Sequence, residues 1–594
     1  MGDPLISLPP GEVLLLVPPG AHADRPALGV HAIQATARAA GHDVRVLYAN
    51  LLLAARLGEE VYAGLCDAPL DWFLTERLFA RALWGQDALH TPAFLALLEV
   101  WAQMLRREAA VADGYRLPAY PLAALERAEA EATALVEELS EAIATAGFSV
   151  VGATTTYDQT NAAMALLTGV KRRAPQVFTL LGGRNTDGPM AQGLASLSPE
   201  VPDLVVSGEA DEAFPALLAR LSLPHPERVL SPPLVQDLDA LPAPDLSEFF
   251  AQRAASLPDA SPPWLVYEGS RGCWWGTCRF CGLVGTGLTS REKSPGKVVE
   301  ELRTLTDTAP VRRISMADNT LPRRAHQELL PALATLREVE LFYEVRPDLT
   351  PARAAALYRA GVRSVQPGIE ALSTPLLRLM RKGSTAGSAL RTLRACRVAG
   401  LDPKWNLLFG VPGDAAAHYR DQLALFPLIE HLTPPVGLGP IALERFSTWV
   451  DEAEAWGIAN LRPRPGYREV FPPHADLDRL AYWFEGEIPS ASLALPELQV
   501  ELADAVQRWR EAWLAPTPPT LRLSGPSPWT LLDTRGGRRA LLHLSPAQAE
   551  AILTGGDPAG PAAAWALRRG YLALLDGKAH PIALAAPSLL SSGR

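Results

Sequence analysis

The pattern of apolar residues opens with two short continuous runs that flank a helical repeat. Val13 to Val17 form the first run, residues 28–40 carry apolar positions at helical spacing and end at Gly41, and residues 44–48 form the second run. Continuous apolar runs are typical of parallel strands buried on both faces, and Gly commonly follows the last turn of a helix. The pattern predicts the β-α-β start of a doubly wound, Rossmann-like α/β domain over residues 1–222.

The same alternation returns after a long helical stretch. Residues 51–139 are rich in aromatic residues within helical patterns, so we expect a helical insertion (about residues 52–140) with an apolar core. Apolar runs at 150–153, 178–181 and 204–206 predict three more strands. The Gly-x-Gly-x-x-Gly phosphate-binding fingerprint is absent from the opening unit, which disfavours a nicotinamide or flavin dinucleotide.

Small and polar residues follow these later strands. Ligands of open α/β sheets bind beyond the carboxyl ends of the strands, and Gly lets the backbone approach a flat ligand closely. Tight strand-to-helix turns favour the same residue types, so both interpretations stay open. The residues concerned are Thr154, Thr155, Thr156, Gln159, Gly182, Gly183, Ser207, Gly208 and Glu209.

A second α/β unit follows a predicted linker. Residues 223–262 are rich in Pro, Asp and Ser, with only a short amphipathic piece near 246–250. Strand and helix patterns then alternate six times over residues 263–450, which predicts a partial (β/α)6 barrel of the TIM type, since a full barrel has eight units. A partial barrel leaves one side open for a large substrate. Polar residues at its strand ends are the expected site residues.

The remaining chain is predicted to cover the barrel and to end in a small domain. Residues 451–515 are expected to be a barrel-capping, substrate-side segment with a helix over 497–513, while residues 434–473 look loop-like and 516–528 form a second linker. Residues 520–590 follow a hairpin-helix-helix-hairpin pattern, with turns at 535–537 and 576–577, which predicts an α+β winged-helix-like domain. This domain is either a cap or a docking surface for a peptide or protein.

Composition and charge narrow the classes of partner. The formal net charge of −10 argues against broad nucleic-acid binding. Residues 1–12 have neither a basic region nor a long apolar run, so no signal peptide is expected, and the run 13–17 is too short to span a bilayer. We therefore expect no nucleic acid and no membrane as partners. The few cysteines favour a cytoplasmic protein.

Three of the five cysteines, Cys273, Cys278 and Cys281, fall within nine residues. Such clustering suits a metal site, and three thiolates can hold three irons of a 4Fe-4S cluster while the fourth iron takes a ligand from elsewhere. Zinc is a weaker interpretation, because it needs a fourth ligand and no His lies between Gly269 and Pro322. A disulfide would leave an odd thiol. Simple packing of the thiols stays open.

The cysteine stretch followed by a partial barrel resembles the radical S-adenosylmethionine (SAM) enzymes. Their usual spacing is Cys-x3-Cys-x2-Cys, whereas the first gap here has four residues, one more than usual. The peptide maturases described below commonly carry a longer insert between the first two cysteines than this chain does. The doubly wound domain in front is similar to the cobalamin-dependent subclass. Several motifs resemble, in order, the radical SAM maturases of ribosomally synthesised peptides, many of which are C-methyltransferases. They lie at residues 25–29, 47–51, 207–209, 270–276, 278–283, 318–321, 366–373, 380–383 and 405–410.

This resemblance implies a cobalamin-dependent radical SAM methyltransferase that C-methylates a residue of a ribosomally synthesised precursor peptide. SAM would supply both methylcobalamin and a 5′-deoxyadenosyl radical. The implied cofactors are a 4Fe-4S cluster, SAM and cobalamin, and the implied partners are the precursor peptide and an electron donor such as flavodoxin or ferredoxin. Two alternatives stay open: non-methylating chemistry such as cyclisation or epimerisation, and a non-catalytic iron–sulfur scaffold that delivers a peptide.

The resemblance also assigns residues. Cys273, Cys278 and Cys281 would hold the cluster, and Leu28 would join the nine strand-end residues named above in binding cobalamin. No protein His is expected on the lower face of the cobalt, because Asp-x-His-x-x-Gly is absent. Tyr267, Glu268 and Glu370 are the expected catalytic residues, and Tyr267 and Glu268 could reach the cluster from just before the loop. The expected SAM-binding residues are Phe280, Asp318, Asn319, Glu344, Arg346, Gln366, Glu370 and Asn406, with barrel packing as the alternative for each.

Overall fold

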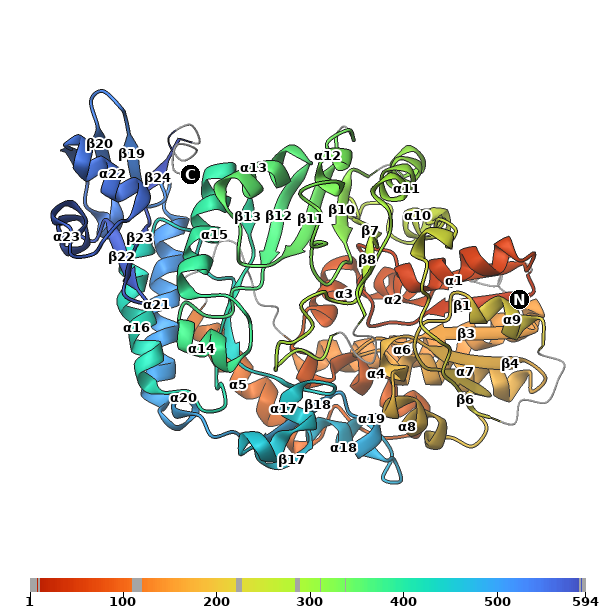
Figure 1. The fold of residues 1–594 in the computed structure, drawn as a ribbon. Helices are drawn as coiled ribbons and strands as arrows, with labels where there is room; N and C mark the ends of the chain where they lie inside the picture. The colour runs from red at the N-terminus through yellow and green to blue at the C-terminus, as the bar shows by residue number, and fades with distance from the viewer. Residues whose placement is uncertain are drawn as a thin grey trace.

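The chain forms a parallel-sheet domain, a partial barrel, a segment that returns from the barrel to the sheet domain, and a small tail domain (Figure 1). The computed structural model describes residues 8, 11–108, 120–220, 227–283, 289–309, 311–336, 338–586 and 589. Parts of the expected first domain and insertion (1–7, 9–10, 109–119, 221–222), of the expected linker (223–226) and of the expected tail domain (587–588, 590) lie outside the described residues.

The N-terminal sheet is parallel, with the order β2-β1-β3-β4-β5-β6. Strand β1, which lies between β2 and β3, is almost fully buried, as its continuous apolar sequence predicts. The strand order reverses between β1 and β3, which creates a crevice at the carboxyl edge of the sheet. The strands are β1 (Val13–Val17), β2 (Val44–Tyr48), β3 (Val150–Thr154), β4 (Phe178–Gly182), β5 (Leu204–Val206) and β6 (Val229–Leu230).

Helices cover this sheet, and an inserted group of helices packs beside it (Figure 1). The covering helices include α1 (Leu28–Ala39), α7 (Thr160–Arg173), α8 (Pro189–Leu197) and α9 (Ala213–Leu218). The insertion is helical, as predicted, and its α4 and α6 pack on α7. Its helices are α2 (Ala49–Leu57), α3 (Glu59–Cys66), α4 (Leu74–Trp84), α5 (Pro92–Glu108) and α6 (Leu122–Ala146).

The stretch predicted to be a linker is instead part of the sheet domain. Strand β6 extends the sheet at one end, and α10 (Ser247–Ser256) packs on β2 at the other. Glu248 accepts a hydrogen bond from the Val46 N–H (2.7 Å). Gln252 accepts from the Tyr48 N–H (2.9 Å) and donates to the Val46 carbonyl (2.8 Å). These side chains satisfy the free backbone edge of β2, so α10 protects it.

The barrel region contains a five-stranded parallel sheet, β13-β12-β11-β10-β7, and a parallel pair, β14-β15. The Leu408 N–H donates to the Glu370 carbonyl (2.8 Å), which links the two sheets. The predicted alternation of strands and helices is thus divided between two sheets, since β13 pairs with β12 and β14 pairs with β15. The strands are β7 (Leu265–Tyr267), β10 (Arg313–Met316), β11 (Glu340–Val345), β12 (Val362–Pro367), β13 (Asp402–Pro403), β14 (Asn406–Phe409) and β15 (Gly437–Pro440), and the main helices are α11 (Pro295–Thr308), α12 (Leu329–Leu333), α13 (Pro351–Arg359), α14 (Thr374–Leu379), α15 (Ala386–Ala399) and α16 (Ala416–Ile429).

Residues 441–490, which we call the return segment, cross from the barrel back to the sheet domain, at the bottom of Figure 1. The prediction of a loop over 434–473 is wrong for most of this stretch. A small antiparallel sheet of β16 (Leu443–Glu444), β17 (Ala459–Pro463) and β18 (Trp483–Glu487) forms there, and α18 (Gly466–Val470) and α19 (Leu477–Leu480) pack on α4 and α8.

The tail domain follows α21 (Pro496–Leu514), which is the helix predicted over 497–513. Its turns lie at 535–537 and 576–577 as predicted, but β19 lies inside the predicted second linker. The Thr374 hydroxyl donates to Asp576 (2.7 Å), which ties the tail to the barrel. The elements are β19 (Leu521–Ser524), β20 (Thr530–Asp533), β21 (Ala540–His543), α22 (Pro546–Thr554), α23 (Pro561–Arg568), β22 (Leu572–Leu575), β23 (Lys578–Pro581) and β24 (Leu584–Ala585).

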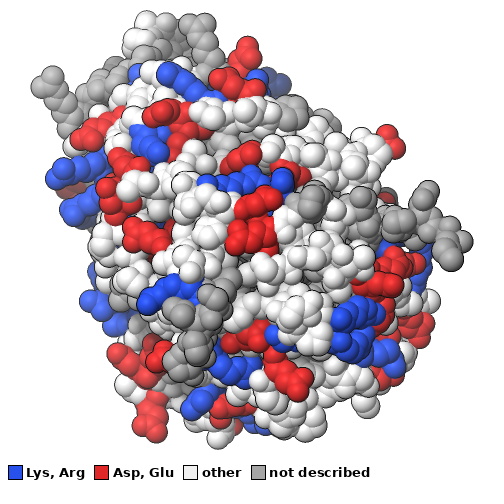
Figure 2. All heavy atoms as spheres, turned by 90° about the vertical axis from the view of Figure 1, so that its right-hand side faces the viewer, with Lys and Arg blue, Asp and Glu red and all other residues white. Residues whose placement is uncertain are grey.

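Over the described residues, no helix combines the length and the apolar character that crossing a bilayer requires. On the face of the molecule shown in Figure 2, Lys and Arg side chains are intermixed with Asp and Glu. The described residues on this face therefore form no extended region of one sign.

Candidate functional site

The three clustered cysteines lie in a loop (residues 272–283, the cysteine loop) that leaves β7 through the short strand β8 (Ser270–Arg271). Strand β8 pairs with β9 (Arg291–Glu292), so the chain enters and leaves this region at one point. Cys273, Cys278 and Cys281 are all half-buried. Burial at the loop is partial, which leaves the thiols accessible to a bound group.

The thiols lie within electrostatic reach of one another. Burial raises the pKa of Cys278, and nearby Lys382 and Arg346 oppose that rise, whereas the charge of Cys273 adds to it. Burial also raises the pKa of Cys281 to about 11, with a further contribution from Cys278. Among the described residues, no three His, Cys, Asp or Glu side chains are grouped closely enough to hold a single metal ion. The ligands of a four-iron cluster each bind a different iron, so they do not have to meet at one point.

Two tryptophans fix the cysteine loop on the barrel. The Trp274 indole donates to the Leu321 carbonyl and the Trp275 indole to the Arg381 carbonyl, both at 3.1 Å. The Arg346 guanidinium lies over both rings, 4.1 Å from the centroid of Trp275 and 5.3 Å from that of Trp274. A cation over an indole face is attractive. The barrel strand end and the loop therefore position each other.

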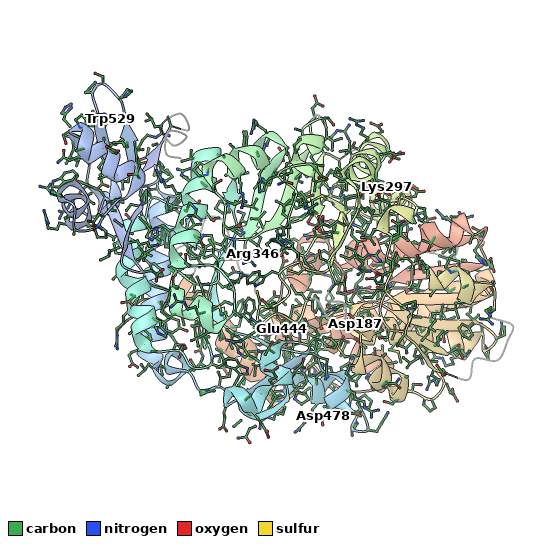
Figure 3. All side chains as sticks on the ribbon, in the orientation of Figure 1. Asp187, Lys297, Arg346, Glu444, Asp478 and Trp529 are labelled. Carbon is green, nitrogen blue, oxygen red and sulfur yellow. The ribbon has the colours of Figure 1, made fainter. Side chains whose placement is uncertain are left out.

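Side chains alternate between the two faces of the barrel strands, and this alternation shows which predicted SAM-binding residues face the barrel interior. Tyr343, Val345 and Val365 are buried against the helices, so Glu344, Arg346 and Gln366 point to the opposite, interior side. Burial raises the pKa of Glu344 to about 7; Lys382 lowers it and Glu370 raises it. Figure 3 labels Arg346 in the middle of the molecule, facing the space between the barrel and the return segment.

Glu370 sits just beyond β12 with a left-handed backbone (φ 60°) and pairs with Lys382 (3.0 Å). A non-glycine residue in this conformation costs free energy and is a frequent mark of a functional site. Lys382 also lies 5.3 Å from the ring centroid of Phe280, which itself packs on Trp449 (6.3 Å). Glu370, Lys382 and Phe280 thus meet near the cysteine loop.

Other predicted residues occupy different positions. Asp318 is 1% exposed, and its Oδ1 accepts from the Gly269 N–H (2.8 Å) and the Ser270 N–H, so it supports the start of the loop from beneath. Asn319 is half-buried beside it. Asn406 is exposed and packs against Gly437, where an added Cβ would lie 2.5 Å from Oδ1.

The prediction that Tyr267 reaches the cysteines is wrong. Its side chain is fully buried on the helix side of the barrel, and its hydroxyl donates to Glu301 of α11 (2.7 Å). Tyr267 is the outward residue of β7, and only the next position, Glu268, returns to the open side. Glu268 pairs with Arg271 (2.9 Å) and faces the edge of the N-terminal sheet.

That edge carries a cleft (the sheet cleft) made of two adjoining pockets of about 340 and 440 Å³, which share Gly29, Val30, Thr154 and Gly183. The cleft lies at the crevice where the strand order reverses. Eight of the predicted cobalamin-binding residues line it: Leu28, Thr154, Thr156, Gln159, Gly182, Gly183, Gly208 and Glu209.

Two predicted residues lie behind the cleft wall. Thr155 is fully buried and accepts a hydrogen bond from the Asn185 amide (3.0 Å). Ser207 is buried, and its hydroxyl accepts from the Gly188 N–H (3.0 Å). A hydroxyl at a strand end can serve the turn that follows as readily as a ligand, and these two serve the turn.

Several cleft residues were not predicted, among them Asp211, Arg271 and Tyr157. Arg271 stands two residues before Cys273, and only its position next to the cysteines could have marked it. Tyr157 has a left-handed backbone (φ 50°). Its N–H donates to the Asn185 side chain, whose amide donates back to the Tyr157 carbonyl, both at 2.7 Å. Such strain cannot be read from sequence.

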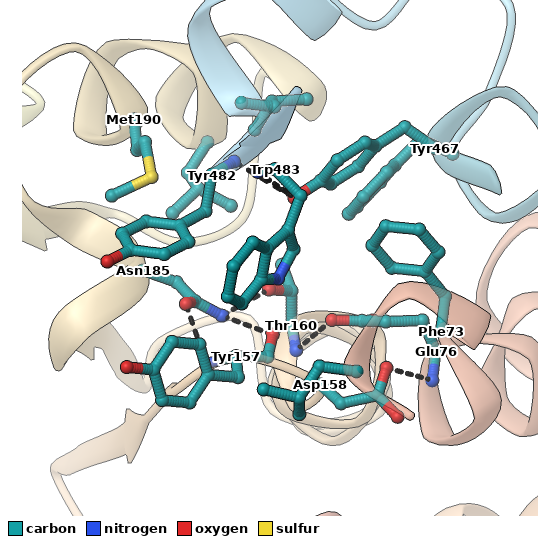
Figure 4. Close-up of a pocket in the computed structure, with 14 residues that line it drawn as sticks. Phe73, Glu76, Tyr157, Asp158, Thr160, Asn185, Met190, Tyr467, Tyr482 and Trp483 are labelled. Carbon is teal, nitrogen blue, oxygen red and sulfur yellow. Dashed lines mark hydrogen bonds between the residues drawn. The ribbon is translucent and has the colours of Figure 1, made fainter. Parts of the chain in front are cut away.

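Figure 4 shows a small pocket lined by Tyr157, where two carboxylates cap each other's helices. Glu76, in the first turn of α4, accepts from the Thr160 N–H (2.7 Å) at the start of α7. Asp158, just before α7, accepts from the Thr75 N–H (2.7 Å) at the start of α4. Burial and, for Glu76, the charge of Asp158 raise the pKa of both. The insertion and the Tyr157 turn are thereby fixed to each other.

Comparison with known proteins places the barrel in a family. Residues 267–424 match the radical SAM superfamily, which confirms the resemblance inferred from the cysteine stretch for this part of the chain. No curated protein matches the chain.

The fold resembles that of two cobalamin-dependent enzymes. One is TsrM from Kitasatospora setae, a radical SAM methyltransferase solved with cobalamin and a 4Fe-4S cluster (TM-score 0.54, 15% identity, 83% of this chain and 91% of that chain). It was also solved with tryptophan substrate and aza-SAM (TM-score 0.53, 14% identity, 82% and 89%). The other is OxsB, solved with aqua-cobalamin and SAM (TM-score 0.54, 11% identity, 85% and 67%). At these identities the similarity is one of fold.

Proposed function

We propose that this chain is a cobalamin-dependent radical SAM C-methyltransferase. The observation that carries the proposal is the position of the cysteine loop of the radical SAM segment. The loop stands at the carboxyl edge of a doubly wound sheet, and Glu268 and Arg271, directly before it, line the sheet cleft. A group in the cleft and a group on the thiols would therefore face the same space. The similarity of fold to TsrM and OxsB supports this assignment.

The residues present fit the three cofactors. Cys273, Cys278 and Cys281 offer three half-buried thiols, and the charges of nearby Lys382 and Arg346 partly offset the rise in the pKa of Cys278 that burial causes. The sheet cleft is open and is lined by glycine and small residues at strand ends, as a flat macrocycle requires. When bound, a 4Fe-4S cluster, SAM and cobalamin would supply radical formation and methyl transfer.

The chain itself would position SAM and exclude water. Glu344 and the Glu370–Lys382 pair on the open side of the barrel offer carboxylate and ammonium groups for the amino and carboxylate ends of SAM. Gln366 on β12 and Asn406 on β14 are exposed and could bind either SAM or substrate. Trp274, Trp275 and Phe280 would shield the loop from solvent.

We further propose that the substrate is a ribosomally synthesised precursor peptide and that a flavodoxin- or ferredoxin-like donor supplies electrons in the cytoplasm. The motif resemblance supports the peptide, and the incomplete barrel supports a large substrate. Modification of a free amino acid instead of a peptide would count against this part of the proposal, since TsrM was solved with tryptophan. Mass spectrometry of the product also separates methylation from cyclisation or epimerisation.

The cysteine assignment is tested by Cys273→Ala, Cys278→Ala and Cys281→Ala, alone and combined. Each should abolish the brown iron–sulfur absorbance after anaerobic reconstitution, because each removes a ligand. Cys396→Ala is the control, because Cys396 lies in α15, outside both the cysteine loop and the sheet cleft. A triple variant with full iron and sulfide content would refute the cluster assignment. Wild-type protein that stays colourless after incubation with hydroxocobalamin and desalting would refute the cobalamin assignment.

A further inference from the structure

Both ends of the cysteine loop are held by side chains that also line the sheet cleft. Glu209, three residues after β5, binds the strand pair from which the loop begins. Arg184, two residues after β4, binds the residue that follows the last cysteine. Two neighbouring strands of the sheet thus each contribute one contact. The first contact is an ion pair, and the second is a hydrogen bond to a backbone carbonyl.

The first contact is a carboxylate between two arginines. Arg271 and Arg291 are direct cross-strand partners on β8 and β9. Glu209 binds Arg291 at 2.6 Å and Arg271 at 3.1 Å, and Arg271 also binds Asp211 at 2.9 Å. The side chains of Arg271 and Arg291 are only 13% and 7% exposed. Burial raises the pKa of Glu209, but Arg291 and Arg271 outweigh it, and the net shift is downward. Glu209 and the two arginines are therefore charged, and solvent screens their attraction only weakly.

The second contact is a forked guanidinium. One terminal nitrogen of Arg184 binds Asp187 (2.6 Å), and the other donates to the carbonyl of Gly282, next to Cys281. The Gly282 N–H donates to Glu444 of the return segment (3.0 Å). Gly282 must lack a side chain, because a Cβ would lie 2.2 Å from the Arg445 carbonyl. Figure 3 labels Asp187 and Glu444, which bind Arg184 and Gly282 respectively, next to each other in the lower half of the view.

We propose that Glu209 and Arg184 are positioning residues that couple occupancy of the sheet cleft to the geometry of the cysteine loop. Both side chains line the cleft, so a ligand that fills it contacts the groups that hold the loop. Coupling between two binding sites is reciprocal, so a group on the thiols would in turn favour the ligand in the cleft. The inference rests on the proposed function, because it takes the cleft ligand as cobalamin and the thiol-bound group as the cluster.

The test measures the cluster itself rather than turnover. Full-length protein is reconstituted with iron and sulfide, with and without saturating hydroxocobalamin, and the midpoint potential and the electron paramagnetic resonance spectrum of the reduced cluster are recorded. We expect cobalamin to shift both in the wild type. Compared at equal iron content and at saturating hydroxocobalamin, Glu209→Gln and Arg184→Lys should lose more than half of each shift. Lysine keeps the charge but cannot bind Asp187 and Gly282 through one fork.

The matched control is Glu137→Gln. Glu137 also bridges two arginines, Arg172 (2.8 Å) and Arg173, but on the surface of the sheet domain. It should keep the full shift. Should Glu209→Gln fail to take up the cluster, Arg291→Lys replaces it, because it weakens the same contact and leaves Glu209 in the cleft. Undiminished shifts in the variants, or no shift in wild type with both groups bound, would overturn the proposal. Wild type that binds neither group would instead overturn the proposed function.

Discussion

At the scale of single residues, the site depends on close approaches that need the absence of a side chain. Gly383 has a left-handed backbone (φ 70°), and a Cβ there would lie 2.1 Å from the Trp275 ring, whose indole nitrogen is already bound to Arg381. The ring cannot retreat without losing that bond and its contact with Arg346. Gly383 therefore lets the barrel contact the cysteine loop directly.

Gly383→Ala should consequently lower both stability and cluster uptake. Backbone strain costs about 1 kcal/mol or more, and overpacking against Trp275 adds about 1–3 kcal/mol. Gly577→Ala is the control, because Gly577 has nearly the same φ (73°) but open space around it. Urea unfolding and iron content of both variants separate strain from clash. Equal losses in the two variants would show that the contact with Trp275 does not matter.

At the scale of elements, a segment was predictable where its own sequence carries the pattern that buries it. Strand β1 and helix α21 form where the sequence predicts them. Helix α10 and strand β19 lie in predicted linkers, because their structure depends on contacts with other elements. Side chains of α10 bind the backbone of β2, and β19 pairs with a strand on either side of it. The sequence also predicts which strand ends form the cleft. It does not distinguish Thr154, which lines the cleft, from Thr155, which is buried behind it, because that difference depends on the surrounding fold.

The reciprocal caps that join α4 to α7 predict a pH dependence of stability. The raised pKa values of Glu76 and Asp158 mean that the folded state holds protons that the unfolded state releases. Their contribution is fully present below the ordinary carboxyl pKa of about 4. It is lost as pH rises through the raised values, so stability should fall between about pH 4 and pH 8.

Asp158→Asn should reduce that fall, because asparagine still caps α4 but carries no charge to bury. The free energy of unfolding in urea, measured at pH 5.5 and pH 8.5, gives the slope for wild type and variant. Asp237→Asn is the control, since Asp237 is an exposed aspartate that caps a short 3-10 helix through the Asp239 N–H (3.0 Å). An unchanged slope in Asp158→Asn would mean that this pair titrates normally.

At the scale of the whole molecule, the return segment connects the barrel, the cysteine loop and the sheet domain. It starts at the barrel, supplies Glu444 to the cysteine loop, contacts the helical insertion around α18, and returns to the barrel at Pro489, whose carbonyl accepts from the Gly413 N–H (2.8 Å). Two ion pairs stabilise the contact with the insertion. Arg77 binds Glu469 (2.6 Å) with side chains 4% and 17% exposed, whereas Arg464 binds Asp71 with side chains 27% and 42% exposed.

The two pairs should differ sharply in their effect on stability. Glu469→Ala leaves the Arg77 guanidinium buried without its carboxylate and removes the acceptor of the Thr91 hydroxyl (2.7 Å), so we expect a loss of about 3 kcal/mol. Asp71→Ala breaks an exposed pair and should cost less than about 1 kcal/mol. Because the return segment also holds Gly282, Glu469→Ala should in addition lower cluster retention during desalting, while Asp71→Ala should not. Unfolding in urea measures the loss of stability, and iron content after desalting measures cluster retention. A destabilised Glu469→Ala that retains its cluster fully would show that the return segment stabilises the insertion but does not support the cysteine loop.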